Sequence, residues 1–214
     1  MKITSIVQLL LSAVGFTISL LVFRIFYFGS FMYIFFAWNL FLAAIPLGIS
    51  NLLVQTKGKS IQWPLFIMWL LFFPNALYIV TDLVHLTDKH PVPFWFDMIL
   101  VFSAAINGLI MAYASLRQVE LFLRTKFSEQ KTGFILCGCL FMGSFGVYIG
   151  RFLRWNSWDV LLNPFGLMTE IVQHIINPFQ HSRTWGMTIV LTVFFSIFYF
   201  TIKKLPALII KTTE

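Results

Sequence analysis

Six hydrophobic runs follow one another along this chain, and each is long enough to cross a lipid bilayer. A transmembrane helix needs about 20 predominantly apolar residues. We expect spans at about residues 6–23, 31–54, 63–86, 94–116, 133–153 and 185–202. These runs fill most of the 214 residues, so no stretch is left for a separate soluble domain. The sequence therefore predicts an all-α, polytopic transmembrane helix bundle that forms a single transmembrane domain over residues 1–214.

The composition agrees with this class of protein. Hydrophobic residues make up 59% of the chain and charged residues only 11%. Soluble domains carry about 25% charged residues. An ordinary soluble domain is therefore excluded.

The segment between the fifth and sixth runs has a different character. Its apolar stretches are too short to span, and the steps Asn163-Pro164 and Asn177-Pro178 interrupt helices. We expect an interfacial or re-entrant segment here. Within it, Glu170 and His174 are one turn apart. One interpretation is that they extend a group of polar residues on the outer side; the favoured one is the solvated face of a short amphipathic helix.

The distribution of basic residues predicts the orientation. Ten of the 15 Lys and Arg residues fall on the side that holds both termini, which also carries the whole net charge of +7. Cytoplasmic loops are enriched in Lys and Arg. We therefore expect a plasma-membrane protein with both termini in the cytoplasm. A positive inner face indicates contact with anionic membrane lipids, and this location of the charge argues against nucleic acid as a partner.

The titratable groups gather on the opposite, outer side. This side is expected to hold five of the eight acids and all four histidines, which are His85, His90, His174 and His181. Ionisable groups near membrane depth are costly and usually face a bundle interior or a water-filled cavity. Any functional site is therefore expected to face outward.

The third span supplies the clearest pattern. Asn75, Tyr78, Asp82 and His85 recur at spacings of three, four and three residues, which places them on one face of a helix. A carboxylate one turn from an imidazole suits acid and base catalysis. The same pair, Asp82 and His85, would supply the ligands of any divalent metal, although the sequence does not favour a metal.

The fourth span adds two polar residues that can meet this face. Asp97 opens the span and Asn107 lies about three turns deeper on much the same side. A catalytic role for Asp82, His85 and Asp97, with substrate binding by the neighbouring polar side chains, is one interpretation. The structural alternative is that Asp82 caps or bridges the bundle and that Asp97 favours a helix N-terminus electrostatically.

Two arginines close the fifth span. Arg151 and Arg154 are expected to share a helix face, and the guanidinium group captures phosphate or carboxylate in bidentate fashion. The adjacent Trp155 and Trp158 are typical of the membrane interface. A clamp for a lipid phosphate is one hypothesis, and pairing of these arginines with outer carboxylates is the other.

Several of these residues together resemble a known family. The matching motifs are Trp38-Asn39-Leu40, Phe73-Pro74-Asn75-Ala76-Leu77-Tyr78, Thr81-Asp82-Leu83, Trp95-Phe96-Asp97 and the run from Gly150 to Asp159. They resemble the motifs of a bacterial membrane family called domain of unknown function 1361. The resemblance covers roughly residues 35 to 165. It implies a polytopic bacterial membrane protein and supplies no established activity.

Three functions are compatible with the sequence. The first is an envelope enzyme or lipid-handling protein whose outward site accommodates a phosphate-bearing lipid or a lipid-linked substrate. The second is a small-solute transporter, or a substrate-binding membrane subunit, in which the intramembrane asparagines line a path. The third is an accessory or scaffold protein. The sequence leaves open whether the chain is an enzyme, which cofactor it uses and whether it forms oligomers.

Overall fold

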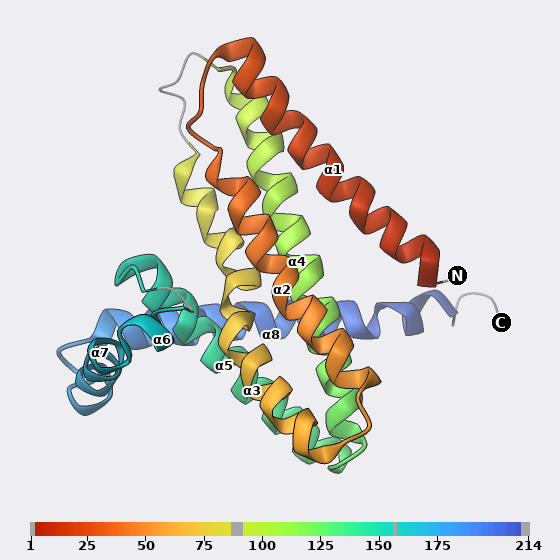
Figure 1. The fold of residues 1–214 in the computed structure, drawn as a ribbon, viewed down its shortest axis with the longest axis vertical. Coiled ribbons are helices and arrows are strands. Elements are labelled where there is room, and N and C mark those ends of the chain that lie inside the picture. Colours follow the sequence, from red (N-terminus) through yellow and green to blue (C-terminus); the bar gives the residue numbers. More distant parts are fainter. Residues whose placement is uncertain (1–2, 87–91, 156–157, 211–214) are drawn as a thin grey trace. The chain divides into compact units, whose positions relative to one another are not determined.

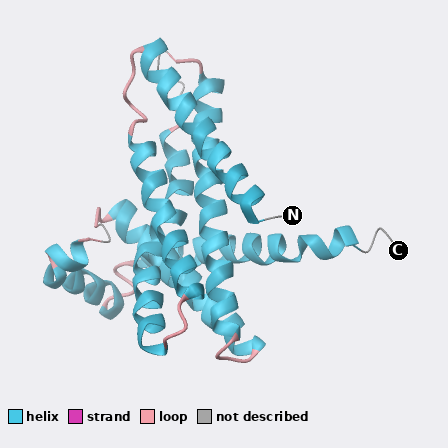
Figure 2. Cartoon of the chain, turned by 45° about the vertical axis from the view of Figure 1, so that its right-hand side comes forward, coloured by secondary structure: helices cyan, strands magenta, loops and turns pink. Residues whose placement is uncertain are grey.

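The computed structural model describes residues 3–86, 92–155 and 158–210, and within these ranges the chain is helical with no strand (Figures 1 and 2). The helices are α1 (Ile3–Phe28), α2 (Phe35–Gln55), α3 (Lys59–Tyr78), the 3₁₀ helix η1 (Ile79–His85), α4 (Phe94–Arg124), α5 (Glu129–Phe152), α6 (Asp159–Leu162), α7 (Pro164–Ile176) and α8 (Ser182–Ile210). Thr87 to Pro91, which include His90, lie outside the described residues.

Six helical segments of the described chain are long and apolar enough to cross a membrane. They are Val7–Phe28, Phe35–Gln55, Lys59–His85, Phe94–Arg124, Glu129–Phe152 and Ser182–Pro206. The predicted all-α polytopic architecture is therefore confirmed. With 13 residues, α7 is about 20 Å long, which is shorter than the roughly 30 Å hydrocarbon core.

The chain divides into two compact units, residues 1–119 and residues 120–214. Unit 1 contains α1, α2, α3, η1 and most of α4, and its core is formed by large apolar side chains such as Trp69, Phe73 and Leu100. In this unit α2 packs along α3 and η1. That both units belong to one transmembrane domain stays a prediction.

A glycine permits close packing in unit 1. A Cβ atom on Gly108 of α4 would lie 3.0 Å from the backbone oxygen of Ala76 and 3.1 Å from the side chain of Ile79. Gly108 therefore lets α4 approach the junction of α3 and η1, as small residues do at membrane helix interfaces.

Unit 2 is built on α5 and α8, which pack together. The indole ring of Trp185 stacks on Phe145 with ring centroids 5.5 Å apart. At the start of α7 the side chain of Asn163 accepts a hydrogen bond from the backbone N–H of Gly166 at 3.1 Å, and Pro164 occupies the first turn. An asparagine cap followed by proline is a favourable helix start.

The environment of His174 differs from the sequence expectation. Its side chain is buried, its Nδ1 lies 2.9 Å from the backbone oxygen of Glu170, and its ring lies 3.8 Å from that of His181. The prediction of a solvated face for His174 was therefore wrong. Trp185 donates to the His174 backbone oxygen, and this contact turns that side of α7 toward the protein.

Candidate functional site in unit 1

A buried ion pair joins the first and fourth helices. Arg24 of α1 donates to both carboxylate oxygens of Asp97 in α4, from Nε at 2.7 Å and from Nη2 at 2.9 Å. The side chains are 0% and 1% exposed. This bidentate geometry is the strongest that the two groups can form. Asp97, expected to take part in catalysis, thus has both carboxylate oxygens bonded to an arginine.

The same arginine organises the turn after α1. Its Nη1 donates to the hydroxyl of Ser30 at 2.7 Å and to the Ser30 backbone oxygen at 3.1 Å. Its guanidinium group lies over the ring of Tyr33, 4.5 Å from the centroid. Gly29, with a φ of 64°, ends α1 in the left-handed conformation that allows this reversal.

The second part of the site lies on η1. The imidazole Nε2 of His85 lies 3.9 Å from Oδ1 of Asp82, and the other carboxylate oxygen accepts a hydrogen bond from Asn39 at 2.9 Å. Asp82 is 1% exposed, whereas the His85 side chain is 41% exposed. A 3₁₀ helix has three residues per turn, so residues three apart lie directly above one another. This winding places the imidazole over the carboxylate. Asn39 of α2 thus forms a hydrogen bond to a residue of η1.

Tyr33 connects the two parts. Its hydroxyl donates to the backbone oxygen of His85 at 2.9 Å. Burial and the nearby Asp97 carboxylate raise the pKa of the Tyr33 hydroxyl, while Arg24 lowers it. The phenol therefore remains a donor. We call Arg24, Ser30, Tyr33, Asn39, Asp82, His85 and Asp97 the polar cluster of unit 1.

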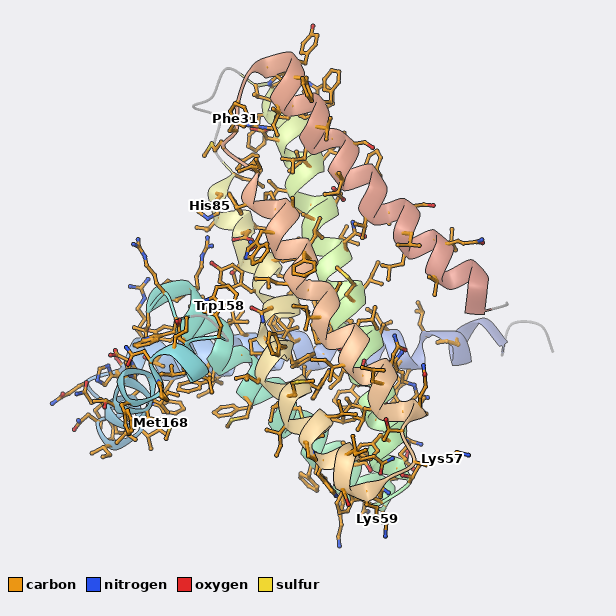
Figure 3. All side chains as sticks on the ribbon, viewed as in Figure 1. Phe31, Lys57, Lys59, His85, Trp158 and Met168 are labelled. Atoms are coloured by element: carbon orange, nitrogen blue, oxygen red, sulfur yellow. The ribbon has the colours of Figure 1, made fainter. Side chains whose placement is uncertain are left out.

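The cluster lies at one end of unit 1. In Figure 3, His85 and Phe31 are at this end, and Lys57 and Lys59 are at the opposite end. The ring of Phe35 meets the His85 ring edge-on at 5.4 Å. Within the cluster, the His85 imidazole is partly exposed, as are Ser30 and Asn39, whereas the Asp82 carboxylate beside His85 is buried.

Asn107, predicted to bind substrate, holds helices together. The side chain is buried and its Nδ2 donates to Thr17 Oγ1 at 2.8 Å and to the backbone oxygen of Ala13 at 3.1 Å, both on α1. The Thr17 hydroxyl also lies 2.9 Å from that of Ser103 on α4. Such amide and hydroxyl contacts stabilise helix pairs in membranes.

Asn75 and Tyr78, also predicted to bind substrate, lie at the end of α3. Asn75 donates to the backbone oxygen of Phe72 at 3.1 Å, one turn earlier in the same helix. Tyr78 is the last residue of α3, and its backbone oxygen accepts a hydrogen bond from the Thr81 hydroxyl at 2.6 Å. Both residues are half-buried.

The two arginines at the end of the fifth span belong to unit 2. Arg151 lies in the last turn of α5, whereas Arg154 follows the end of the helix and has a φ of 60°. The expectation that they share one helix face was wrong, because α5 ends at Phe152. Arg154 instead has a left-handed backbone conformation just beyond the helix.

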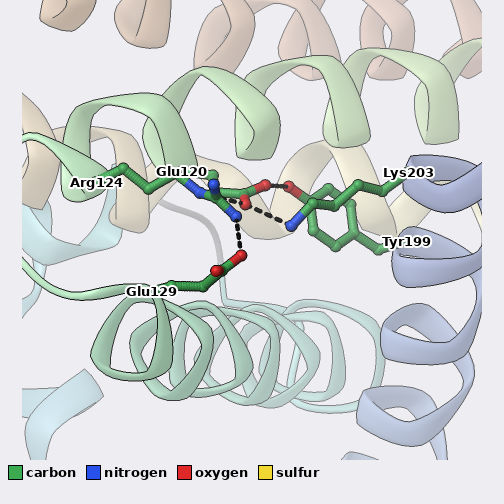
Figure 4. A network of polar contacts seen from close by, with 5 residues as sticks. All are labelled: Glu120, Arg124, Glu129, Tyr199 and Lys203. Carbon is green, nitrogen blue, oxygen red and sulfur yellow. Dashed lines mark hydrogen bonds and ion pairs between the residues drawn. The ribbon is translucent and has the colours of Figure 1, made fainter.

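Unit 2 also holds a buried acid. Glu120 is 1% exposed, and its carboxylate bonds to Arg124, to Lys203 of α8 and to the Tyr199 hydroxyl (Figure 4). Arg124 also reaches Glu129 at 2.8 Å. This network pairs two acids with two bases and fastens α8 to the end of α4.

Sequence reasoning missed two members of these clusters. The expected spans 6–23 and 94–116 end before Arg24 and before Glu120. The run Phe26-Tyr27-Phe28 after Arg24 was the available signal, because it continues the hydrophobic helix beyond the charge. An arginine inside such a helix is expected to pair with a carboxylate or with backbone carbonyls.

No group of three or more His, Cys, Asp or Glu side chains is placed to hold a metal ion in the part of the chain that the structure describes. Asp82 and His85, the pair expected to bind any metal, thus have no third ligand of these types among the described side chains.

The helices and their buried polar contacts define a multi-pass, α-helical membrane protein. The family described as Protein of unknown function (DUF1361) matches residues 38–198, which is more than half of the chain. The chain belongs to this family, and the resemblance inferred from its motifs is confirmed. No curated protein matches the chain, and no solved structure matches it.

Proposed function

We propose that the chain is a bacterial plasma-membrane protein that transfers a proton to or from a lipid or lipid-linked envelope substrate at its outer surface. The observation that carries the proposal is the Asp82 and His85 pair. It combines a buried carboxylate, held by Asn39, with an imidazole that is 41% exposed. Both termini are assigned to the cytoplasm by the excess of basic residues on their side.

The chemistry follows from the two side chains. Histidine can accept and donate a proton near neutral pH, which makes it the commonest general acid or base. A fixed carboxylate beside the ring orients it and stabilises its protonated form. The separation of 3.9 Å exceeds a hydrogen bond, so the pair must close by about 1 Å in the working state.

The position of the pair supports an amphiphilic substrate. His85 ends the third membrane-spanning segment, and the large apolar side chains of Phe31, Phe94 and Trp95 are exposed on the segments that follow α1 and begin α4. Aromatic side chains at the ends of spans are typical of the headgroup region. A substrate with an acyl chain in the membrane would present its polar group at this level.

We separately propose that Arg151 and Arg154 of unit 2 bind the phosphate of an anionic lipid. Guanidinium groups at the end of a span suit the capture of a phosphate-bearing lipid. This proposal has its own test. If Arg151→Gln and Arg154→Gln leave the binding of anionic lipid vesicles by the purified protein unchanged, the phosphate assignment is wrong, whatever the result at His85.

The proton-transfer proposal is tested with His85→Ala and Asp82→Asn. Each variant replaces the chromosomal copy in the host, and the membrane lipids and lipid-linked intermediates are compared by mass spectrometry. We expect the lipid profile of both variants to match that of a deletion strain. Val84→Ala is the matched control, because Val84 lies on η1 between the two residues and is exposed.

A wild-type lipid profile in His85→Ala at equal protein level would refute this function. It would favour an accessory or scaffold protein, for which the contacts of Asn39 and Asn107 with protein groups are the supporting observation. Under that alternative, substitutions in the cluster lower the stability of the protein, and His85→Ala changes nothing else.

A further inference from the structure

The short helix α7 of unit 2 has three chemically distinct sides. At 3.6 residues per turn, Leu167, Ile171 and His174 fall on the first side. Leu167 forms a core cluster with Phe145 and Ile149 of α5, and Ile171 packs against that cluster. This side therefore faces the protein.

The second side is apolar and uncovered. It carries Phe165, Met168, Val172, Ile175 and Ile176, all of which are exposed, with Phe165 at 86% and Ile176 at 69%. Figure 3 marks Met168 on this helix. The positions recur every three or four residues, so they form one continuous stripe along α7.

The third side is polar. Thr169 and Gln173 are exposed, and Gly166 and Glu170 flank them. Around the helix, the order is the protein side, the apolar stripe and then the polar side. A helix with these three sides fits a boundary where protein, lipid and water meet.

We propose that α7 lies along the surface of the membrane with its apolar stripe inserted among the acyl chains of one leaflet. Its 13 residues are too few to span. Amphipathic helices of this kind insert about 5–10 Å into the boundary between headgroups and acyl chains. The inference does not rest on the proton-transfer site.

We expect lipid to cover the apolar stripe of α7, because the same unit already has an exposed apolar surface on α8. In the same unit, α8 exposes Ile189, Val190, Val193 and Ile197 along a segment apolar enough to cross the membrane. In a membrane-spanning helix, these four side chains would contact the acyl chains of the lipids. A contiguous exposed apolar patch marks a membrane or protein contact, and the stripe of α7 adds to a lipid-facing surface that this unit already has.

The proposal also decides between a surface helix and a re-entrant one. A re-entrant segment needs its backbone and polar groups enclosed by protein or by a water-filled cavity. Here the polar side is exposed and the helix begins and ends with asparagine caps, Asn163 and Asn177. These features suit a helix whose ends and polar side meet water.

Nitroxide spin labels test the three sides in the full chain, reconstituted in vesicles of phosphatidylcholine with a minor fraction of phosphatidylglycerol. Cys137→Ser and Cys139→Ala provide a background without native thiols. Labels are then introduced with Val172→Cys and Ile176→Cys on the stripe, and with Gln173→Cys on the polar side. Collision rates with molecular oxygen, which dissolves in lipid, and with a water-soluble nickel chelate are measured at each label.

We expect the ratio of oxygen to nickel accessibility to change from above one at 172 and 176 to below one at 173. The depth of the stripe labels should lie near the headgroup boundary. High nickel accessibility on the stripe would show that water covers it. Low accessibility to both reagents would show a protein cover, and a depth near the bilayer centre would show re-entry. Each of these three results overturns the proposal.

If Val172→Cys or Ile176→Cys prevents folding, Met168→Cys replaces it, since Met168 is exposed on the same stripe. Ile171→Cys gives the reference for the protein side. That label should show low accessibility to both reagents.

Discussion

Removing one partner of the Arg24 and Asp97 pair should destabilise the protein far more than removing both. We consider Asp97→Leu, Arg24→Leu and the double variant. In Asp97→Leu, a guanidinium group that is 0% exposed loses two charge-assisted hydrogen bonds and its counter-charge. Breaking a buried ion pair from one side costs about 3–5 kcal/mol, because an uncompensated charge stays buried.

The double variant has no buried charge at this position. Replacing a buried pair by apolar side chains is often neutral, so its cost should remain well below the sum of the single losses. Ser30 would still lose its contact with Arg24 in this variant, which adds roughly 1 kcal/mol. We expect a coupling energy of at least about 3 kcal/mol, which corresponds to at least roughly 100-fold in the unfolding equilibrium constant.

The assay is equilibrium unfolding of the purified protein in mixed micelles, with increasing amounts of a denaturing detergent. Ser19→Ala on α1 is the control, since its exposed hydroxyl bonds to the backbone oxygen of Gly15 in the same helix. That control should change stability by less than about 0.5 kcal/mol. If the two single effects add to the double effect within about 0.5 kcal/mol, Arg24 and Asp97 do not act as a pair and the reasoning fails.

Other substitutions test further contacts by the same unfolding assay. Gly108→Ala should cost about 1–3 kcal/mol, because its Cβ would lie 3.0 Å from the Ala76 oxygen. Asn107→Ala should cost about 1–3 kcal/mol, since it removes two hydrogen bonds between α1 and α4. Glu120→Ala should cost about 3–5 kcal/mol, whereas Glu129→Gln, at an exposed end of the same network, should cost less than about 1 kcal/mol.

For each of these substitutions, one result would contradict the prediction. Gly48→Ala is the control for Gly108, because no atom lies within 4 Å of its added Cβ, and equal effects of the two would disprove close packing at Gly108. A neutral Asn107→Ala would mean that its amide does not hold α1. Equal losses for Glu120→Ala and Glu129→Gln would mean that burial does not distinguish the two acids.

The sequence predicts the spans because hydrophobic runs determine which segments enter the membrane, but it locates the helix ends less well. The fourth run ends at Leu116, whereas α4 continues to Arg124. Residues such as Arg117 and Gln118 are good helix formers, so polar character ends the apolar run without ending the helix. Glu120 thereby becomes part of a folded helix and is covered by Lys203 and Tyr199.

The partners within the candidate site could not be predicted for a related reason. The spacing of Asp82 and His85 correctly indicates one helix face, since that relation is local. The partner of Asp97 depends on which helices pack together, and 73 residues separate it from Arg24 in sequence. The expected first span ends at residue 23 and therefore leaves Arg24 outside the bundle. Its burial follows from the continuation of α1 to Phe28.

The 3₁₀ winding of η1 also sets how deep its side chains sit in the bilayer. A 3₁₀ helix rises about 2.0 Å per residue and an α-helix about 1.5 Å. Over the seven residues of η1 the difference amounts to roughly 3–4 Å of extra length along the helix axis. If η1 rewound as α-helix, His85 would be drawn toward the hydrocarbon by that distance and turned away from Asp82. The winding of these seven residues thus sets both the depth of the His85 imidazole in the membrane and its position over the Asp82 carboxylate.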